Sequence, residues 1–67
     1  MTIEERIEQR ADEIRESYED ASLDEIYADA SNNHIWALGS DDDDEATEFE
    51  ITADALRLIA WEREAKK

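Results

Sequence analysis

Apolar residues recur at helical spacing through the first part of the chain. They follow one another at intervals of four, four, three and four positions: Ile3, Ile7, Ala11, Ile14 and Tyr18. Because an α-helix has about 3.6 residues per turn, this spacing places the five residues on one face. Thr2 and Glu5 fit the pattern of a capping box at the start of such a helix. The pattern predicts a helix over residues 3–19.

A row of acids flanks this apolar stripe. Its members are spaced four residues apart: Glu4, Glu8, Asp12, Glu16 and Asp20. Like charges at this spacing repel on a helix by roughly 0.2–0.5 kcal/mol per pair, so the row costs on the order of 1–2 kcal/mol. That is a large share of the stability of a small domain. Solubility alone is more often achieved by a mixture of acidic and basic residues. The row therefore indicates a surface whose function depends on negative charge.

The acidity extends well beyond that row. The chain has 21 Asp and Glu against seven Lys and Arg, a formal net charge of −14. Between Arg15 and Arg57 lie 14 acids and not one Lys or Arg. Anionic membranes and nucleic acid are poor partners for such a chain. A basic protein surface is its natural complement.

The length of 67 residues predicts a single small acidic domain over residues 1–67. Without Cys it has neither a disulfide nor a thiolate metal site to stabilise it. Its apolar runs are too short for a membrane-spanning helix. The first residues lack the basic start and apolar core of a signal peptide. We therefore expect a cytoplasmic protein, located in the host cytoplasm if a phage encodes it.

The middle of the chain allows two interpretations, and the first is an α+β fold. A second capping-box pattern at Ser22 and Glu25 predicts a short helix over 23–30, and the Ser-Asn-Asn of residues 31–33 indicates its end. Residues 47–52 alternate between polar and apolar, as strands do. Segments 33–38 and 46–51 are then a two-stranded antiparallel hairpin. The predicted domain has two N-terminal helices, this hairpin, and a C-terminal helix over 53–65 capped by Thr52.

The alternative is an all-α three-helix domain. In that case the second helix continues to Leu38, with Gly39 as its C-terminal cap residue, and a long third helix starts near Asp44. In either fold we expect Trp36 and Trp61 to lie in or near the core. The other role open to a Trp is that of an anchor in a protein interface, where Trp is enriched.

Catalytic and metal-binding motifs are absent from the sequence. An EF-hand loop starting at Asp41 would need Gly at position 46 and Glu at position 52, where the chain has Ala46 and Thr52. His34 is the single histidine and has no Cys to join it in a zinc site. A chain this short has little room for a substrate pocket of about 300 Å³ or more. We expect a non-enzymatic protein with no cofactor and no metal.

The acids themselves are therefore the candidate functional residues. We predict that they bind a basic nucleic-acid-binding protein by mimicking the phosphates of DNA or RNA, and that the chain is a monomer or a homodimer. Two other interpretations stay open: a salt-adapted halophilic protein, and an acidic antitoxin that masks a basic protein. The predicted partner-binding residues are Glu4, Glu8, Asp12, Glu16, Asp20, Asp24, Glu25, Asp29, Asp41, Asp42, Asp43, Asp44, Glu45, Glu48 and Glu50.

In its size and charge distribution the chain resembles the small acidic inhibitors made by phages and mobile elements. The resemblance rests on the acid row that starts at Glu4 and on the base-free tract between Arg15 and Arg57, with no residue-level motif. That class includes anti-CRISPR and anti-restriction proteins, which occupy DNA-binding grooves. The resemblance implies an inhibitor of a defence or host protein.

Overall fold

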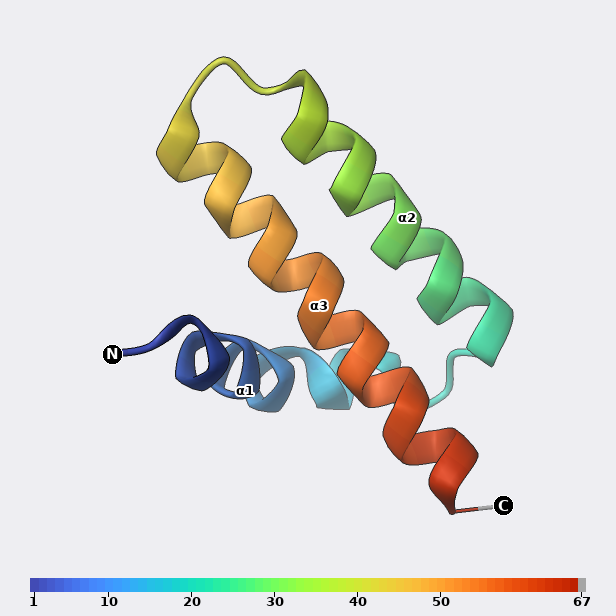
Figure 1. The fold of residues 1–67 in the computed structure, drawn as a ribbon. Helices are drawn as coiled ribbons and strands as arrows, with labels where there is room; N and C mark the ends of the chain where they lie inside the picture. The colour runs from blue at the N-terminus through green and yellow to red at the C-terminus, as the bar shows by residue number, and fades with distance from the viewer. Residues whose placement is uncertain (67) are drawn as a thin grey trace.

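A computed structural model describes residues 1–66 as a helical fold (Figure 1). The elements are α1 (Ile3–Ile14), a short 3₁₀ helix η1 (Arg15–Tyr18), α2 (Leu23–Gly39) and α3 (Asp43–Ala65). Residues 1–66 contain no strand. The predicted α+β fold with its hairpin is therefore wrong, and the all-α three-helix alternative fits.

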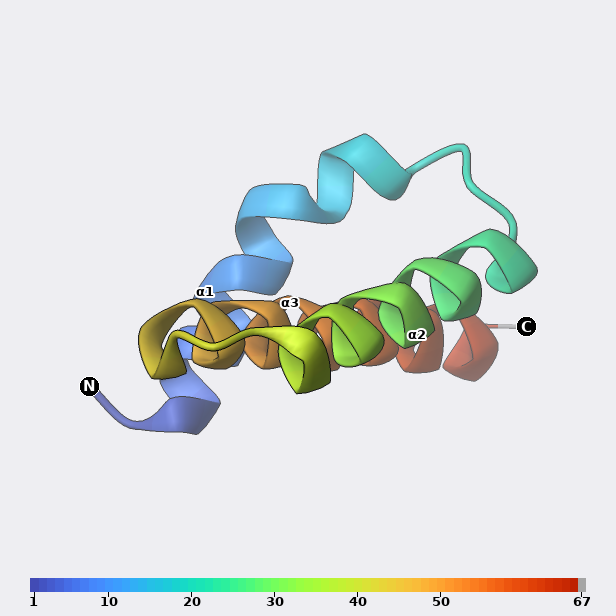
Figure 2. The same ribbon diagram turned by 90° about the horizontal axis from the view of Figure 1, so that it is seen from above.

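The helices form two layers. α2 and α3 run antiparallel, side by side, and a short connection after Gly39 joins them (Figure 1). α1 and η1 lie across one face of this pair, as the view from above shows (Figure 2). Within residues 1–66, no helix covers the opposite face of the α2–α3 pair (Figure 2).

The two polar signals that predicted breaks lie inside helices. Within the expected stop at residues 31–33, the Asn33 side-chain amide donates to the Asp29 carbonyl oxygen at 2.8 Å. Thr52, expected to cap the last helix, donates its hydroxyl proton to the Glu48 carbonyl oxygen at 3.0 Å. Each side chain thus bonds to the preceding turn of its own helix, which lets the helix continue.

Side-chain caps set the helix starts. Thr2 and Glu5 form the predicted capping box, and the Glu5 amide donates to the Thr2 hydroxyl at 3.2 Å. The Ser22 hydroxyl accepts from the Glu25 amide at 3.2 Å. Asp42, which the sequence did not single out as a cap, accepts from the Asp44 amide at 2.9 Å and starts α3. The acids that follow Asp42 lie in the first turn, where the helix dipole favours negative charge.

α1 ends earlier than predicted, and a side chain of α3 binds the end of η1 and the segment that follows it. The helix predicted over 3–19 is α-helical only to Ile14, and η1 follows. Arg63 of α3 donates to the carbonyl oxygens of Tyr18 and Ala21. Tyr18 is the last residue of η1, and Ala21 lies in the connection to α2. At a helix end the backbone carbonyls lack donors from a following turn, and a cationic side chain can donate to them instead. The expected cap residue Gly39 is itself the last residue of α2, with no positive φ.

The core between the layers is built largely from alanine. Ten apolar side chains are buried and six of them are Ala, while Ile26 and Leu56 are the largest that are fully buried. Small side chains let helices approach closely but remove little apolar surface from water. Of the predicted α1 stripe, Ala11 is buried, Ile7, Ile14 and Tyr18 are partly buried, and Ile3 is 53% exposed. On α3, Ala53, Leu56, Ile59 and Ala60 are buried.

We expect Leu56→Ala to lower the free energy of unfolding by about 2–5 kcal/mol, because the cavity it leaves is in the core. The matched control is Leu38→Ala, the same chemical change at a side chain that is 74% exposed. It should stay within about 0.5 kcal/mol of wild type. Urea unfolding followed by circular dichroism measures both. Equal losses in the two variants would contradict this core and would mean that Leu38 is buried in solution.

Candidate partner-binding surface

The acid row that dominates the sequence is divided among three local structures. Glu4, Glu8 and Asp12 lie on α1, Glu16 lies in η1, and Asp20 lies in the turn that follows. All five side chains are exposed. Because α1 ends at Ile14, the regular spacing on one helix holds for the first three acids alone. The expectation that the row follows a single helix over residues 3–19 is therefore wrong beyond Ile14.

The opposite flank of α1 carries two arginines that hold the helix to α3. Arg6 binds Glu48 at 2.6 Å, Arg10 binds the other carboxylate oxygen of Glu48, and Arg10 also donates to the Thr52 hydroxyl at 2.7 Å. The hydrogen bond from Arg10 and the charges of Arg10 and Arg6 hold the pKa of Glu48 below its ordinary value. Glu48 was a predicted partner-binding residue. Its carboxylate is instead engaged inside the protein.

Two more predicted acids are engaged in the same way. Asp12 binds Arg15 at 2.5 Å, and Arg15 reaches across to Glu62 of α3 at 2.8 Å. These hydrogen bonds with Asp12 and Glu62 raise the pKa of Arg15. A carboxylate oxygen of Glu50 lies 2.6 Å from the Nδ1 of His34. This contact joins α3 to α2.

Asp29 has a hydrogen-bonding role within the fold. Its carboxylate accepts from the Tyr18 hydroxyl at 2.7 Å, which ties the end of η1 to α2. Burial and this contact with Asp29 raise the pKa of Tyr18 to about 12. Sequence periodicity placed Tyr18 on the buried stripe but could not show where its hydroxyl would point.

The remaining predicted acids form no ion pair within residues 1–66. They are Glu4, Glu8, Glu16, Asp20, Asp24, Glu25, Asp29, Asp41, Asp42, Asp43, Asp44 and Glu45. All are exposed except Asp29. They gather in two places: along α1, η1 and the start of α2, and at the connection into α3. Asp42 of this set also caps α3.

The arginines, by contrast, are paired within the fold, whereas Lys66 is exposed and forms no ion pair within residues 1–66. All five arginines contact an acid or a backbone carbonyl: Arg6, Arg10, Arg15, Arg57 and Arg63. Arg6, Arg10, Arg15 and Arg63 link different elements, whereas Arg57 pairs with Asp54 within α3.

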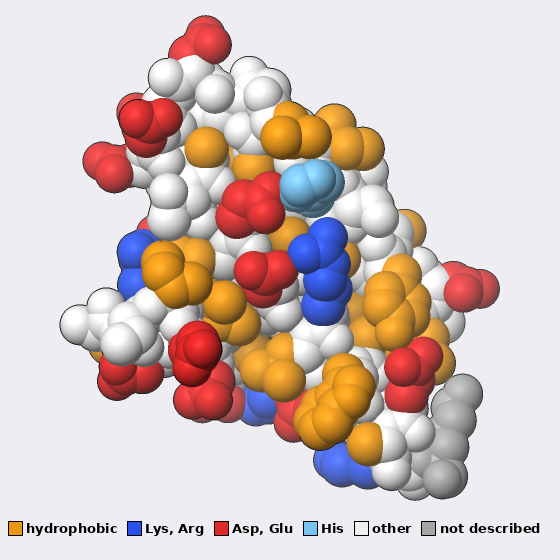
Figure 3. Space-filling model, in the orientation of Figure 1, with side chains coloured by type: hydrophobic (Ala, Val, Ile, Leu, Met, Phe, Trp, Pro, Cys, Tyr) orange, Lys and Arg blue, Asp and Glu red, His pale blue; other side chains and the backbone are white. Residues whose placement is uncertain are grey.

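Large apolar side chains are a second feature of the surface, and the sequence interpretation missed it. Trp36 is 54% exposed and Trp61 is 64% exposed, so the expectation that both lie in the core is wrong. Trp36 leans against Phe49 with ring centroids 5.8 Å apart. Tyr27, Ile35 and Leu38 on α2 are also exposed. On the face opposite α1, hydrophobic side chains lie around a central group of acidic, basic and His side chains, and further acids lie near the margins (Figure 3).

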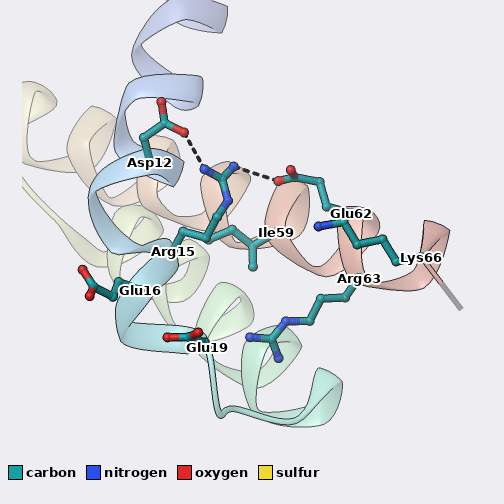
Figure 4. Close-up of a pocket in the computed structure, with 8 residues that line it drawn as sticks. All are labelled: Asp12, Arg15, Glu16, Glu19, Ile59, Glu62, Arg63 and Lys66. Carbon is teal, nitrogen blue, oxygen red and sulfur yellow. Dashed lines mark hydrogen bonds and ion pairs between the residues drawn. The ribbon is translucent and has the colours of Figure 1, made fainter.

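Two hollows lie beside α1 and η1. The first is lined by both signs of charge, and there Arg15 bridges Asp12 and Glu62 (Figure 4). The second lies next to it and is lined by Glu8, Asp12, Arg15, Leu58, Trp61 and Glu62. It joins the acid row of α1 to exposed apolar surface of α3.

Residues 1–66 bring together no group of three or more His, Asp or Glu that could hold a metal ion. In the same residues, no helix has the length and apolar character to cross a bilayer.

Comparison with known proteins yields no relative. The chain matches no family model, no curated protein and no solved structure.

The Glu48 cluster makes a prediction about pH. Because the native pKa of Glu48 is lowered, its contribution to stability is fully present above its unfolded pKa and is lost as the pH falls through its native pKa. We expect Glu48→Gln to be less stable than wild type at pH 7, with the difference shrinking as the pH falls below about 4. Thermal unfolding across this range measures it.

Glu4→Gln serves as the control, since Glu4 forms no ion pair within residues 1–66. It should not lower stability at pH 7 by more than about 0.5 kcal/mol. A Glu48→Gln protein as stable as wild type at pH 7 would show that Arg6 and Arg10 do not need this carboxylate.

Proposed function

We propose that the protein is a non-enzymatic inhibitor that occupies the basic nucleic-acid-binding surface of a defence or host protein. Its carboxylates take the place of DNA or RNA phosphates. One observation carries the proposal: the arginines are engaged within the fold, while twelve of the predicted acids form no ion pair within residues 1–66. Such a surface attracts a basic partner and raises the rate of encounter.

The dimensions suit this role. Duplex DNA carries about one charge per 1.7 Å of its axis, which is denser than the step of about 6 Å between successive acids on one helix. A mimic must therefore combine acids from several elements, and here α1, η1, α2 and the start of α3 all contribute. The molecule extends 39 Å in its longest dimension, close to one duplex turn of about 34–36 Å. In this proposal the protein acts in the cytoplasm, as do the anti-CRISPR-like inhibitors that the chain resembles.

The response to salt separates this role from halophilic adaptation. A mimic folds at physiological ionic strength, because its core residues such as Ile26 and Leu56 do not depend on ions. A halophilic protein needs molar salt to screen its own repulsion. We expect a cooperative thermal transition at about 0.1 M salt. A chain that is unfolded there and folds in molar salt would contradict the proposal.

The tagged protein is first used to isolate a basic target protein from a bacterial lysate. Binding of variants to that target is then measured. Neutralising Glu4 and Glu16 with Gln should weaken binding about three- to tenfold, with a flatter salt dependence. The control neutralises Glu13 and Glu64, which changes the net charge equally but lies outside the predicted set. Duplex DNA should compete for the same site. A target that holds DNA and this protein together, or equal losses in both variants, would rule out a shaped phosphate mimic.

A further inference from the structure

We propose that the second hollow, between α1 and α3, receives an arginine side chain of the basic partner, with Trp61 as the surface on which the guanidinium stacks. This assignment rests on the proposed function, because it takes the partner to be basic. It goes beyond that function by placing a specific anchor within a surface that otherwise acts through general charge.

The hollow combines an apolar floor with an acidic rim. Leu58 and Trp61 are three residues apart on α3, so they lie next to each other on one face. Glu8 and Asp12 face them from α1, spaced four residues apart. Leu58 is half-buried, whereas Trp61 keeps 64% of its surface exposed.

The exposure of Trp61 is costly for a protein with so small a core. A tryptophan buries roughly 150–250 Å² when it is covered, and each Å² of apolar surface removed from water contributes about 25 cal/mol. Neither α1 nor α2 covers this side chain, although it lies beside α1 in the hollow. Trp and Arg are the residue types most enriched among the energetic centres of interfaces. A partner that covers Trp61 would therefore gain from burial at this point.

The charges of the rim select arginine as the occupant. Asp12 and Glu62 already bind Arg15, while Glu8 forms no ion pair within residues 1–66. With three acids against one arginine, the hollow stays negative. A planar guanidinium can stack on the indole and bond to a carboxylate at its edge, whereas a lysine ammonium is a compact, strongly hydrated charge. A second copy of this chain would bring further negative charge, which the rim repels.

The test uses short arginine and lysine homopolymers of equal length as probes, at about 0.1 M salt. Calorimetry gives the affinities, and the indole Nε1–H signals of Trp61 and Trp36 in NMR spectra report which tryptophan is touched. We expect the arginine peptide to bind about three- to tenfold more tightly than the lysine peptide and to shift the Trp61 signal. Trp61→Ala should abolish this preference, and Trp61→Phe should retain part of it.

Trp36→Ala is the matched control, since Trp36 is also an exposed tryptophan but packs on Phe49 outside this hollow. It should leave the preference for arginine intact. If the arginine and lysine peptides bind with equal affinity to the wild-type protein and to Trp61→Ala, the proposed arginine anchor is wrong and the charge-based function stands. If neither peptide binds wild type, the proposed attraction to basic partners is overturned together with the anchor.

Discussion

The convergence of Arg6 and Arg10 on Glu48 is the contact on which the rest of this molecule depends. The alanine-rich core buries few large side chains, so α1 gains only modest stability from apolar contact. The two arginines compensate by joining α1 to α3 through one carboxylate. The same arrangement gives α1 two unlike flanks. Its basic flank is turned to α3 and its acidic flank is left in water, so the contact that stabilises the fold also creates the negative surface.

Local signals in the sequence were sufficient for the starts of α1 and α2 and for part of the core, but not for the start of α3 at Asp42. The capping residues Thr2 and Ser22 depend on neighbours within one turn, and both cap their helices as predicted. Of the predicted stripe, Ala11 is buried and Ile7, Ile14 and Tyr18 are partly buried, but Ile3 is exposed. The hairpin failed because the alternation around Glu48 and Glu50 has another cause. These two acids, two residues apart, serve different helices: Glu48 binds arginines of α1, and Glu50 lies against His34 of α2. A polar alternation that satisfies two flanking helices resembles the pattern of a strand.

The candidate surface could be predicted in charge but not in detail. Composition alone showed that acids would dominate the exterior. Which of them are engaged within the fold depends on tertiary contacts such as the bridge from Arg15 to Glu62, between residues far apart in the chain. The four-residue spacing of Arg6 and Arg10 was a visible signal of a basic flank on the first helix. The exposure of both tryptophans had no local signal, because alanines fill the helix interface and leave no room there for a large ring.

The contact between Arg63 and the carbonyl oxygens of Tyr18 and Ala21 bears on how the molecule opens. It fastens the segment after α1 to the far end of α3, and the Tyr18–Asp29 bond fastens the same segment to α2. The beginning of α1 is held to α3 by Arg6, which binds Glu48, but Met1 and Ile3 at its N-terminal end are exposed. We therefore expect local opening to start at the exposed residues before Arg6, while α2 and α3 remain paired. In amide hydrogen exchange, this gives a gradient of protection along α1, weakest in its first turn.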